Sequence, residues 1–394
     1  MATTNCYEDL MVISANMSLF IFNKPNKQQL ADQLDAVSLV RKIDVSQFCL
    51  TANTKKDHKH KNEENVAGDS DAEAKAEAKS LNNQIINACF SHSGNIYALV
   101  TAFKQLVVFD VNKDWQIRGE VKVFPKAPTI VHFDKTDANI LISDRAGYIR
   151  RYQVDQLSEA KESEELLGHL SMLLDFCLSP DGRFILTADR DEKLRISRYP
   201  QTFVIEQFCL GHTSFVSSVA CFSNLAITSG GDGTVRFWDM NSGECAFATQ
   251  TIFNSPVKKI CVFPTDLAQP NLCRMAVLTE DSNCVHFLSC QVDSWSLKQS
   301  DVTVDVEDAL LDITIDSGSN VVCPGKNGIY LAKTEDSEFK IIVLSETKTI
   351  LEELKQCTEA APLCSLYKKV EFGNLHQYKA IKEEKMLRKR KLVD

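Results

Sequence analysis

Residues 211–239 read Gly-His-Thr-Ser-Phe-Val-Ser-Ser-Val-Ala-Cys-Phe-Ser-Asn-Leu-Ala-Ile-Thr-Ser-Gly-Gly-Asp-Gly-Thr-Val-Arg-Phe-Trp-Asp, and this stretch decides the fold class. It opens on a Gly-His pair and then carries three short apolar runs that are separated by turn residues. Short apolar runs between Gly, Asp and Asn turns are typical of β-strands. A Gly-His start and a Trp-Asp end together mark one blade of a WD-repeat β-propeller.

The same pattern recurs along the chain. A second Gly-His pair at Gly168 precedes the pair at Gly211 by 43 residues. The third strands of successive units are predicted to end at seven places, namely Asn23, Asp110, Gln153, Arg198, Asp239, Ser289 and, faintly, Lys333. From Asp110 onward their mean spacing of about 45 residues matches a four-stranded blade, and the longer first interval contains the insertion described below. The sequence therefore predicts an all-β, seven-bladed WD-repeat β-propeller over residues 1–345, with the clearest repeats at about 85–125, 167–200 and 210–240.

Two stretches do not fit the repeat. Residues 51–80 are mostly Lys, Asp, Glu, Asn and Ala, with Val66 as the only large aliphatic residue, which predicts a disordered insertion. Residues 346–394 form a C-terminal extension. Within it, residues 368–391 hold nine Lys and Arg and three Glu, so this stretch carries +6 while the whole chain carries −9. We expect an acidic body and a basic, helical tail.

The tail ends in a basic run formed by Arg388, Lys389, Arg390 and Lys391. Such a run is typical of a nuclear-import signal or of a segment that contacts nucleic-acid phosphates, and the sequence leaves both open. It predicts the nucleus as the location of the protein and leaves the cytoplasm open as a second one. No apolar run is long enough for a membrane span, and Glu8 and Asp9 stand where a signal peptide would be basic and then apolar.

The sequence also disfavours an enzyme. It contains no GxGxxG, Walker, GxSxG or HExxH motif, so no cofactor and no catalytic residue are predicted. Fourteen Cys are scattered without a Cys-x-x-Cys pair, mostly inside apolar runs, which predicts small buried side chains and no metal site.

The His and Asp residues of the repeats have a structural interpretation. In the blade quoted above, we expect His212, Thr228, Asp232 and Trp238 to form one buried hydrogen-bond chain, which stabilises a blade only if every member is paired. The preceding blade keeps His169, with Thr187 and Asp191, but has Ser197 in place of the Trp. We expect its network to be incomplete.

The middle of the chain resembles a known family. Residues 168–175 (Gly-His-Leu-Ser-Met-Leu-Leu-Asp), residues 179–197 and residues 208–217 (Phe-Cys-Leu-Gly-His-Thr-Ser-Phe-Val-Ser) closely resemble the WD-repeat, non-catalytic subunit of the tRNA (guanine-N7) methyltransferase. The insect, wuho-like members look most similar. Residues 366–378 also resemble the C-terminal element of that family.

The resemblance implies a heterodimer whose two subunits have different functions. A separate catalytic subunit binds S-adenosylmethionine and forms 7-methylguanosine in the tRNA variable loop, while the propeller holds that subunit in a competent conformation. The chain itself then contacts tRNA through the complex and needs no cofactor. The resemblance further implies that the partner is bound by Arg190, Asp191, Lys193 and Arg195, and that Arg195 pairs with an acidic side chain of the partner.

One alternative of a different class stays open. A WD-repeat propeller with a charged turn also suits a scaffold that recognises substrates or regulates translation within another complex, because the fold by itself does not decide the function.

Overall fold

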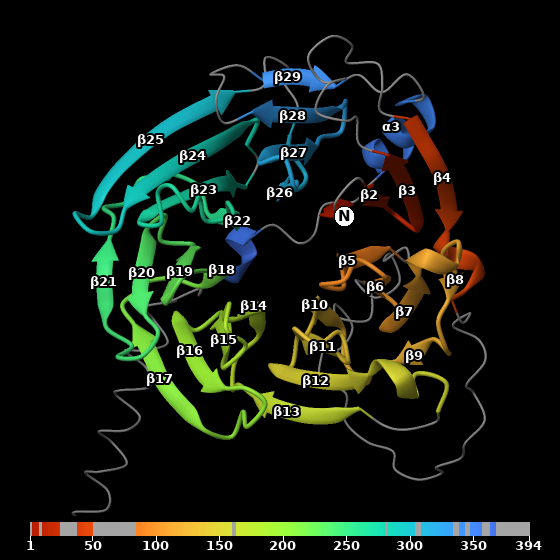
Figure 1. Cartoon of the computed structure of the whole chain (residues 1–394), viewed down its shortest axis with the longest axis horizontal. Helices are drawn as coiled ribbons and strands as arrows, with labels where there is room; N and C mark the ends of the chain where they lie inside the picture. Colours follow the sequence, from red (N-terminus) through yellow and green to blue (C-terminus); the bar gives the residue numbers. More distant parts are fainter. Residues whose placement is uncertain are drawn as a thin grey trace, which may run out of the picture.

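The computed structural model describes most of the chain. The described residues are 2–7, 10–23, 38–49, 84–159, 163–280, 282–303, 309–333, 339–342, 347–356 and 363–367. They form seven antiparallel sheets that stand around a central axis (Figure 1). The predicted all-β, seven-bladed propeller is therefore confirmed. The predicted insertion at about 51–80 and the basic tail from residue 368 onward, including Arg388 to Lys391, lie outside the described residues.

Each blade is built from strands that follow one another in the chain. The strands of blades 1 to 4 are β1 (Ala2–Tyr7), β2 (Leu10–Ala15), β3 (Ser18–Asn23) and β4 (Ser38–Asp44); β5 (Ile85–Phe90), β6 (Ile96–Thr101), β7 (Gln105–Asp110), β8 (Gln116–Ile117) and β9 (Lys122–Val123); β10 (Pro128–Phe133), β11 (Asn139–Asp144), β12 (Tyr148–Gln153) and β13 (Glu164–Gly168); and β14 (Leu173–Leu178), β15 (Phe184–Asp189), β16 (Lys193–Arg198) and β17 (Ile205–Leu210).

Blades 5 to 7 follow the same plan. Their strands are β18 (Val216–Phe222), β19 (Leu225–Gly230), β20 (Val235–Asp239) and β21 (Cys245–Ala248); β22 (Val257–Val262), β23 (Leu272–Thr279), β24 (Cys284–Gln291) and β25 (Ser296–Thr303); and β26 (Thr314–Ile315), β27 (Asn320–Pro324), β28 (Ile329–Lys333) and β29 (Phe339–Ile342). The described helices are short, namely η2 (Val45–Gln47), η3 (Val111–Lys113), η4 (Val154–Gln156), α3 (Thr347–Gln356) and η5 (Leu363–Leu366).

The repeat spacing located the third strands well. The third strands of blades 1 to 5 and of blade 7 end at the predicted residues. In blade 6, β24 ends at Gln291, two residues beyond the predicted Ser289. Leu272 pairs with Gln291 and Cys273 with Cys290, so the longer partner strand β23 extends the ladder past the expected end.

The blades pack face to face. All six residues of the middle strands β6 and β15 are buried, because each of these strands has a neighbouring blade on both sides. The apolar clusters accordingly span pairs of blades; one of them joins Val216 and Trp238 of blade 5 to Leu194 and Cys209 of blade 4. A strand that is buried on both faces reads as a continuous apolar run rather than as an alternating one.

A repeated hydrogen bond links the inner strands of neighbouring blades. In each case a polar side chain on the inner strand, or just before it for Asp312, accepts a hydrogen bond from a backbone N–H in the next blade. The pairs are Asn87 Oδ1 with Val131 N at 3.0 Å, Asp175 Oδ2 with Val219 N at 2.8 Å, Ser218 Oγ with Ile260 N at 3.0 Å, and Asp312 Oδ2 with Thr4 N at 2.9 Å. The acceptors of blades 2, 4 and 5 lie at irregularities in the register of their strands. These hydrogen bonds link adjacent blades close to the central axis of the propeller.

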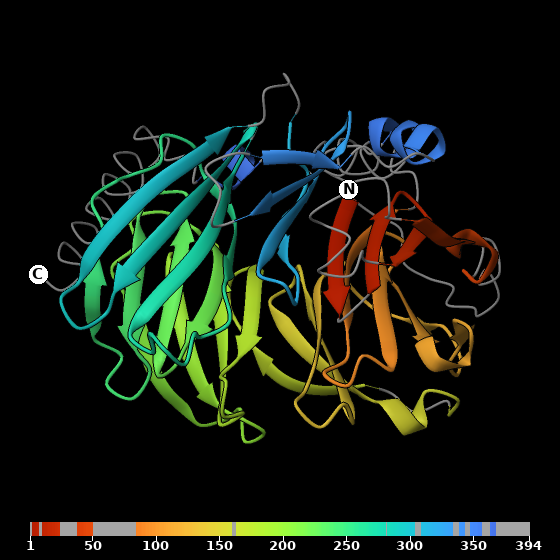
Figure 2. The same cartoon turned by 45° about the horizontal axis from the view of Figure 1, so that its top comes forward.

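The ring closes between blades 7 and 1 through side chains. No strand is shared between these two sheets within the described ranges. Besides accepting the Thr4 amide, Asp312 pairs with Lys259 of blade 6 at 2.9 Å. Helix α3 buries Ile350 and Leu354 in the apolar cluster that spans blades 1 and 7. Both views place α3 beside blade 1 (Figures 1 and 2), so this helix stabilises the seam.

The inner-strand carboxylate of Asp175 has a perturbed acidity. Burial raises the pKa of Asp175 to about 6, although the amides of Val219 and Phe176 and the charge of Lys259 act in the opposite direction. The folded chain therefore binds this proton more tightly than the unfolded chain, in which an Asp titrates near pH 4. The stability that this protonation contributes is lost as the pH rises through 6.

We predict that Asp175→Asn removes this pH dependence. Relative to the natural chain, the variant should gain about 1–3 kcal/mol in unfolding free energy between pH 4 and pH 7, because its amide cannot ionise. Urea unfolding of both proteins at a series of pH values measures the difference. A difference between the two proteins that stays constant across this range would contradict the prediction. Asn87→Ala, which removes an equivalent but uncharged acceptor in blade 2, is the control.

Candidate functional site

The polar network of blade 5 is a continuous chain of hydrogen bonds. Trp238 Nε1 donates to Thr228 Oγ1 at 2.8 Å, and Thr228 Oγ1 lies 2.8 Å from His212 Nε2. His212 Nδ1 lies 2.8 Å from Asp232 Oδ2. One consistent assignment has each group donate to the next, with the Nδ1–H of the histidine directed at the carboxylate. Burial by itself would raise the pKa of Asp232, but His212 and the amides of Thr234 and Thr213 hold it well below its usual range.

Blade 4 has a different acidic residue in its network. His169 Nε2 lies 2.9 Å from Thr187 Oγ1, as in blade 5, but His169 Nδ1 meets Asp189 Oδ2 at 3.2 Å. The expectation that Asp191 takes this place is wrong. Blade 5 has Gly230 in the position of Asp189 and so must use the turn aspartate. In blade 4, Asp189 lies closer to the imidazole of His169, and Asp191 remains in the turn.

Arg195 lies inside blade 4. It is 8% exposed, and its guanidinium donates to Ser197 Oγ at 2.9 Å, Gly168 O at 3.0 Å and Thr202 O at 3.4 Å. Burial lowers the pKa of Arg195. Because Ser197 is much smaller than the tryptophan one blade on, the arginine side chain turns along the strand toward it. The family resemblance implied that Arg195 lies at the surface and pairs with the partner. In the structure its guanidinium donates to acceptors inside the propeller.

The charged turn, residues 190–193, joins β15 to β16. Asp189 Oδ1 accepts the amides of Asp191 at 2.8 Å and Lys193 at 3.1 Å, and Glu192 adopts a positive φ of 72°. The amide of Arg190 donates to Met172 O at 3.0 Å, which ties the turn to the loop between β13 and β14. The turn is therefore a fixed structure in which the acidic residues Asp191 and Glu192 stand between the basic residues Arg190 and Lys193.

Exposed apolar side chains lie beside the charged turn. Phe208 and Leu210 on the outer strand β17 are 51% and 65% exposed, whereas Cys209 between them is buried. Leu210 pairs with Lys193 and Phe208 with Arg195 in the strand register. Leu170, in the loop that the charged turn contacts, is fully exposed. We call Leu170, Phe208, Leu210 and the charged turn the docking face.

The apolar part of the docking face was not predicted from the sequence. Phe-Cys-Leu at 208–210 entered the prediction only through the family resemblance. The signal was present, because three consecutive apolar residues on an outer strand cannot all be buried when only one side of that strand faces a neighbouring blade. Exposed apolar groups next to charged residues of both signs are typical of protein interfaces. In such interfaces the apolar contacts provide affinity and the charges provide orientation.

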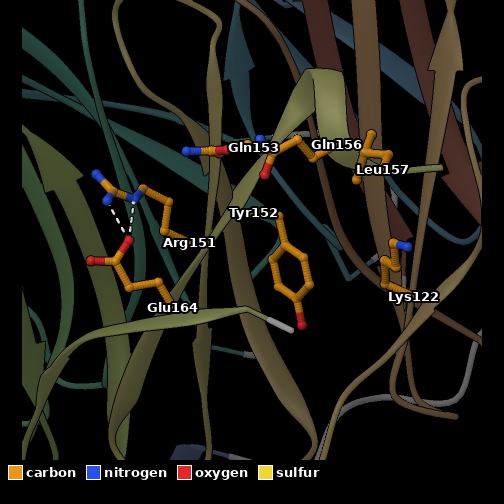
Figure 3. A pocket seen from close by; sticks show the side chains of 7 residues that line it. All are labelled: Lys122, Arg151, Tyr152, Gln153, Gln156, Leu157 and Glu164. Carbon is orange, nitrogen blue, oxygen red and sulfur yellow. Dashed lines mark hydrogen bonds and ion pairs between the residues drawn. The ribbon is translucent and has the colours of Figure 1, made fainter. Parts of the chain in front are cut away.

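One pocket among the described residues lies where blades 2 and 3 meet. The pocket in Figure 3 is lined by Lys122, Arg151, Tyr152, Gln153, Gln156, Leu157 and Glu164, and has a volume of about 50 Å³. A volume of this size holds one or two waters rather than a nucleoside cofactor. Its Arg151 and Glu164 already pair with each other, with Nε and Oε2 3.0 Å apart.

The thiols and carboxylates do not form a reactive or metal-binding group either. Cys245 is exposed, whereas Cys209, Cys273, Cys290 and Cys323 are buried. Burial raises the pKa of Cys209 and Cys273 to about 12. No group of three or more His, Cys, Asp or Glu side chains that could hold a metal ion occurs in the ranges that the structure describes. In those same ranges, no helix has the length and apolar character to cross a membrane.

Fold and docking face together define a WD-repeat interaction subunit, a class of protein that acts by binding other proteins. Comparison with known proteins places it more narrowly. Residues 150–324 match the family model of the tRNA methyltransferase TRM82 WD40 domain. A tRNA (guanine-N(7)-)-methyltransferase non-catalytic subunit of Caenorhabditis elegans is 32% identical over 76% of this chain and 75% of its own length. The chain belongs to the family of tRNA (guanine-N7) methyltransferase non-catalytic subunits.

Other relatives match over shorter stretches. The human WDR4 non-catalytic subunit is 41% identical over 40% of this chain and 38% of its own length. The TRM82 subunit of Saccharomyces cerevisiae is 34% identical over 39% of this chain and 36% of its own length. A chain in a crystal structure of the mitotic checkpoint complex superposes with a TM-score of 0.62 at 13% identity, covering 85% of this chain and 91% of that chain. That likeness concerns the fold alone.

We predict that the blade 5 network contributes strongly to stability. Thr228→Val should lower the unfolding free energy by about 2–4 kcal/mol, because it leaves both Trp238 Nε1 and His212 Nε2 buried without a partner. Thermal or urea unfolding measures the change. Thr213→Val, at an exposed position whose side chain is outside the network, should change it by less than about 0.5 kcal/mol. Equal effects of the two substitutions would contradict the prediction.

Proposed function

We propose that this chain is the non-catalytic, regulatory subunit of a heterodimeric tRNA (guanine-N7) methyltransferase. It binds and stabilises a catalytic subunit that uses S-adenosylmethionine to form 7-methylguanosine in the variable loop of tRNA. The observation that carries the proposal is the docking face, found on the part of the chain that also matches the family model. Cofactor binding and methyl transfer belong to the partner.

The chemistry of the docking face defines what the partner must offer. Leu170 and Leu210 would lose their exposed apolar surface against apolar side chains of the catalytic subunit, which provides most of the affinity. Asp191, Lys193 and Arg190 would pair with groups of opposite charge around that contact and fix its orientation. The catalytic subunit should therefore present an apolar patch flanked by both basic and acidic residues.

Arg195 has a different part in this proposal. Its hydrogen bonds to Gly168 O in blade 3 and to Ser197 Oγ in blade 4 hold two neighbouring blades together directly beneath the docking face. We assign Arg195 to the support of that face. Pairing with an acidic side chain of the partner would require the guanidinium to exchange at least one of its internal acceptors.

The basic tail adds a role in RNA binding or transport. Its nine Lys and Arg follow Tyr367, whose hydroxyl donates to Gly231 O at 2.8 Å. The tail therefore starts on the side of the propeller that carries the charged turn, and it can contact the phosphates of a tRNA bound by the partner while base choice stays with the enzyme. The run from Arg388 to Lys391 would also direct the protein to the nucleus.

We predict that Leu210→Glu prevents assembly. The introduced carboxylate would have to be desolvated against an apolar partner surface, so the affinity for the catalytic subunit should fall at least about 100-fold. Co-expression with the catalytic subunit, co-purification and a tRNA methylation assay provide the measurement. Leu267→Glu is the control, because Leu267 is also exposed, at 94%, but lies between β22 and β23 in blade 6 and outside the docking face.

Intact assembly of the Leu210→Glu protein would contradict the proposal that the docking face binds the catalytic subunit. Methylation of tRNA by the catalytic subunit at an undiminished rate without this chain would contradict the regulatory function as a whole. Methyl transfer by this chain alone would contradict the assignment of catalysis to the partner.

A separate prediction concerns the tail. Deletion of residues 379–394 should weaken tRNA binding by the assembled complex and reduce the steepness with which tRNA affinity falls as salt rises, because phosphate contacts are lost. Assembly itself should be unaffected. Filter binding at several salt concentrations measures this effect. An unchanged tRNA affinity would rule out the phosphate contact, and the location of the truncated protein in cells then tests the import signal.

A further inference from the structure

A short C-terminal segment lies across three blades on the side of the propeller that carries the charged turn. This segment consists of η5 and Tyr367, residues 363–367, and we call it the strap. Figure 1 shows η5 inside the ring of blades, near β18 and β22. The strap touches the turn between β23 and β24 in blade 6, the turn between β19 and β20 in blade 5, and the charged turn in blade 4.

The contacts of the strap involve three consecutive blades. The amide of Leu363 donates to the carboxylate of Glu280 in blade 6. Tyr367 Oη donates to Gly231 O in blade 5 at 2.8 Å, and its ring meets Phe215 edge-on with centroids 5.2 Å apart. Leu366 O accepts a hydrogen bond from Arg190 Nε in blade 4 at 3.3 Å. Each end of the strap is thus bound to a different blade.

The anchor of Tyr367 depends on the local backbone of blade 5. A Cβ on Gly231 would lie only 2.6 Å from Phe215 Cε1 and 2.5 Å from Ser214 Oγ. Glycine therefore allows the phenylalanine ring to lie against the turn, where it can meet the tyrosine beside the Gly231 carbonyl. The residues that hold Tyr367 were visible in the sequence, but their juxtaposition with residue 367 arises only in the folded chain.

The strap constrains one residue of the docking face directly. Arg190 is held at its amide by Met172 O and at Nε by Leu366 O. An arginine loses much of its side-chain conformational freedom when it is immobilised. A side chain that is already oriented avoids part of this loss on binding, so preorganisation raises affinity without adding a contact.

We infer that the strap is a positioning element of the docking face, and that Tyr367 raises the affinity for the catalytic subunit by fixing Arg190 through Leu366. Tyr367 is a positioning residue in this scheme. The inference rests on the proposed function, because it assigns a role to the strap at the same docking face.

A double-mutant cycle tests the inference. Tyr367→Ala removes the hydroxyl contact and the ring contact, and should weaken binding of the full-length chain to the catalytic subunit about three- to tenfold. Tyr367→Phe, which keeps the ring, should have a smaller effect. Arg190→Ala should weaken binding to a similar extent, and adding Tyr367→Ala to it should cause little further loss, because the strap acts through Arg190. Titration calorimetry measures all four proteins.

Three results would overturn the inference. These are an unchanged affinity of the Tyr367→Ala protein, a tighter affinity, as expected if the strap competed with the partner, and fully additive effects of the two substitutions. Melting temperatures of the same proteins identify any loss of folding. Because Tyr367 is partly exposed, the Tyr367→Phe protein should melt like the natural chain.

Leu210→Glu separates this inference from the proposed function. If Leu210→Glu abolishes binding and Tyr367→Ala leaves it unchanged, the docking face stands and only the role of the strap fails. If neither substitution affects binding, the docking face itself is wrong.

Discussion

The propeller depends on contacts between sheets that share no strand ladder. Within the described ranges, neighbouring blades are joined by buried apolar faces and by inner-strand side chains that accept an amide of the next blade, such as Asp175 with Val219 and Asp312 with Thr4. Packing gives no preferred register, whereas a hydrogen bond to one particular amide does. These bonds therefore set how each blade is aligned with the next, and the seam relies on the same device together with α3.

Within the blades, a second polar system makes the turns rigid. In blade 5, Trp238, Thr228, His212 and Asp232 satisfy one another completely. Blade 4 departs from this plan at two positions, with Ser197 in place of the tryptophan and Asp189 in place of a glycine. The consequences are local: Asp189 takes over the histidine, Arg195 folds inward, and the residues of the charged turn remain at the surface. A deviation from the repeat thus coincides with the docking face, where a binding function would be expected to override the repeat.

Much of this was predictable from the sequence. The spacing of the Gly-His pairs and strand ends located six of seven third strands to the residue, since side-chain alternation and turn residues are local properties of the chain. The third strand of blade 6 ends two residues later than predicted because its partner strand, β23, is longer than the corresponding strands of the other blades. It was not predictable that Asp189, and not Asp191, bonds to His169. Both residues precede β16, and only their distances to the imidazole differ.

The sequence by itself determined the fold, the network of blade 5 and the family, because each depends on residues that recur at fixed intervals or lie in one contiguous stretch. Only the tertiary structure decided which of the charged residues face outward. It placed the guanidinium of Arg195 among carbonyls from two blades and left Leu170 and Leu210 exposed. It also brought residues 363–367 onto turns that lie 83 to 176 residues earlier in the chain. The physical reason is that exposure and long-range contact are properties of the packed ring, set by how neighbouring blades meet.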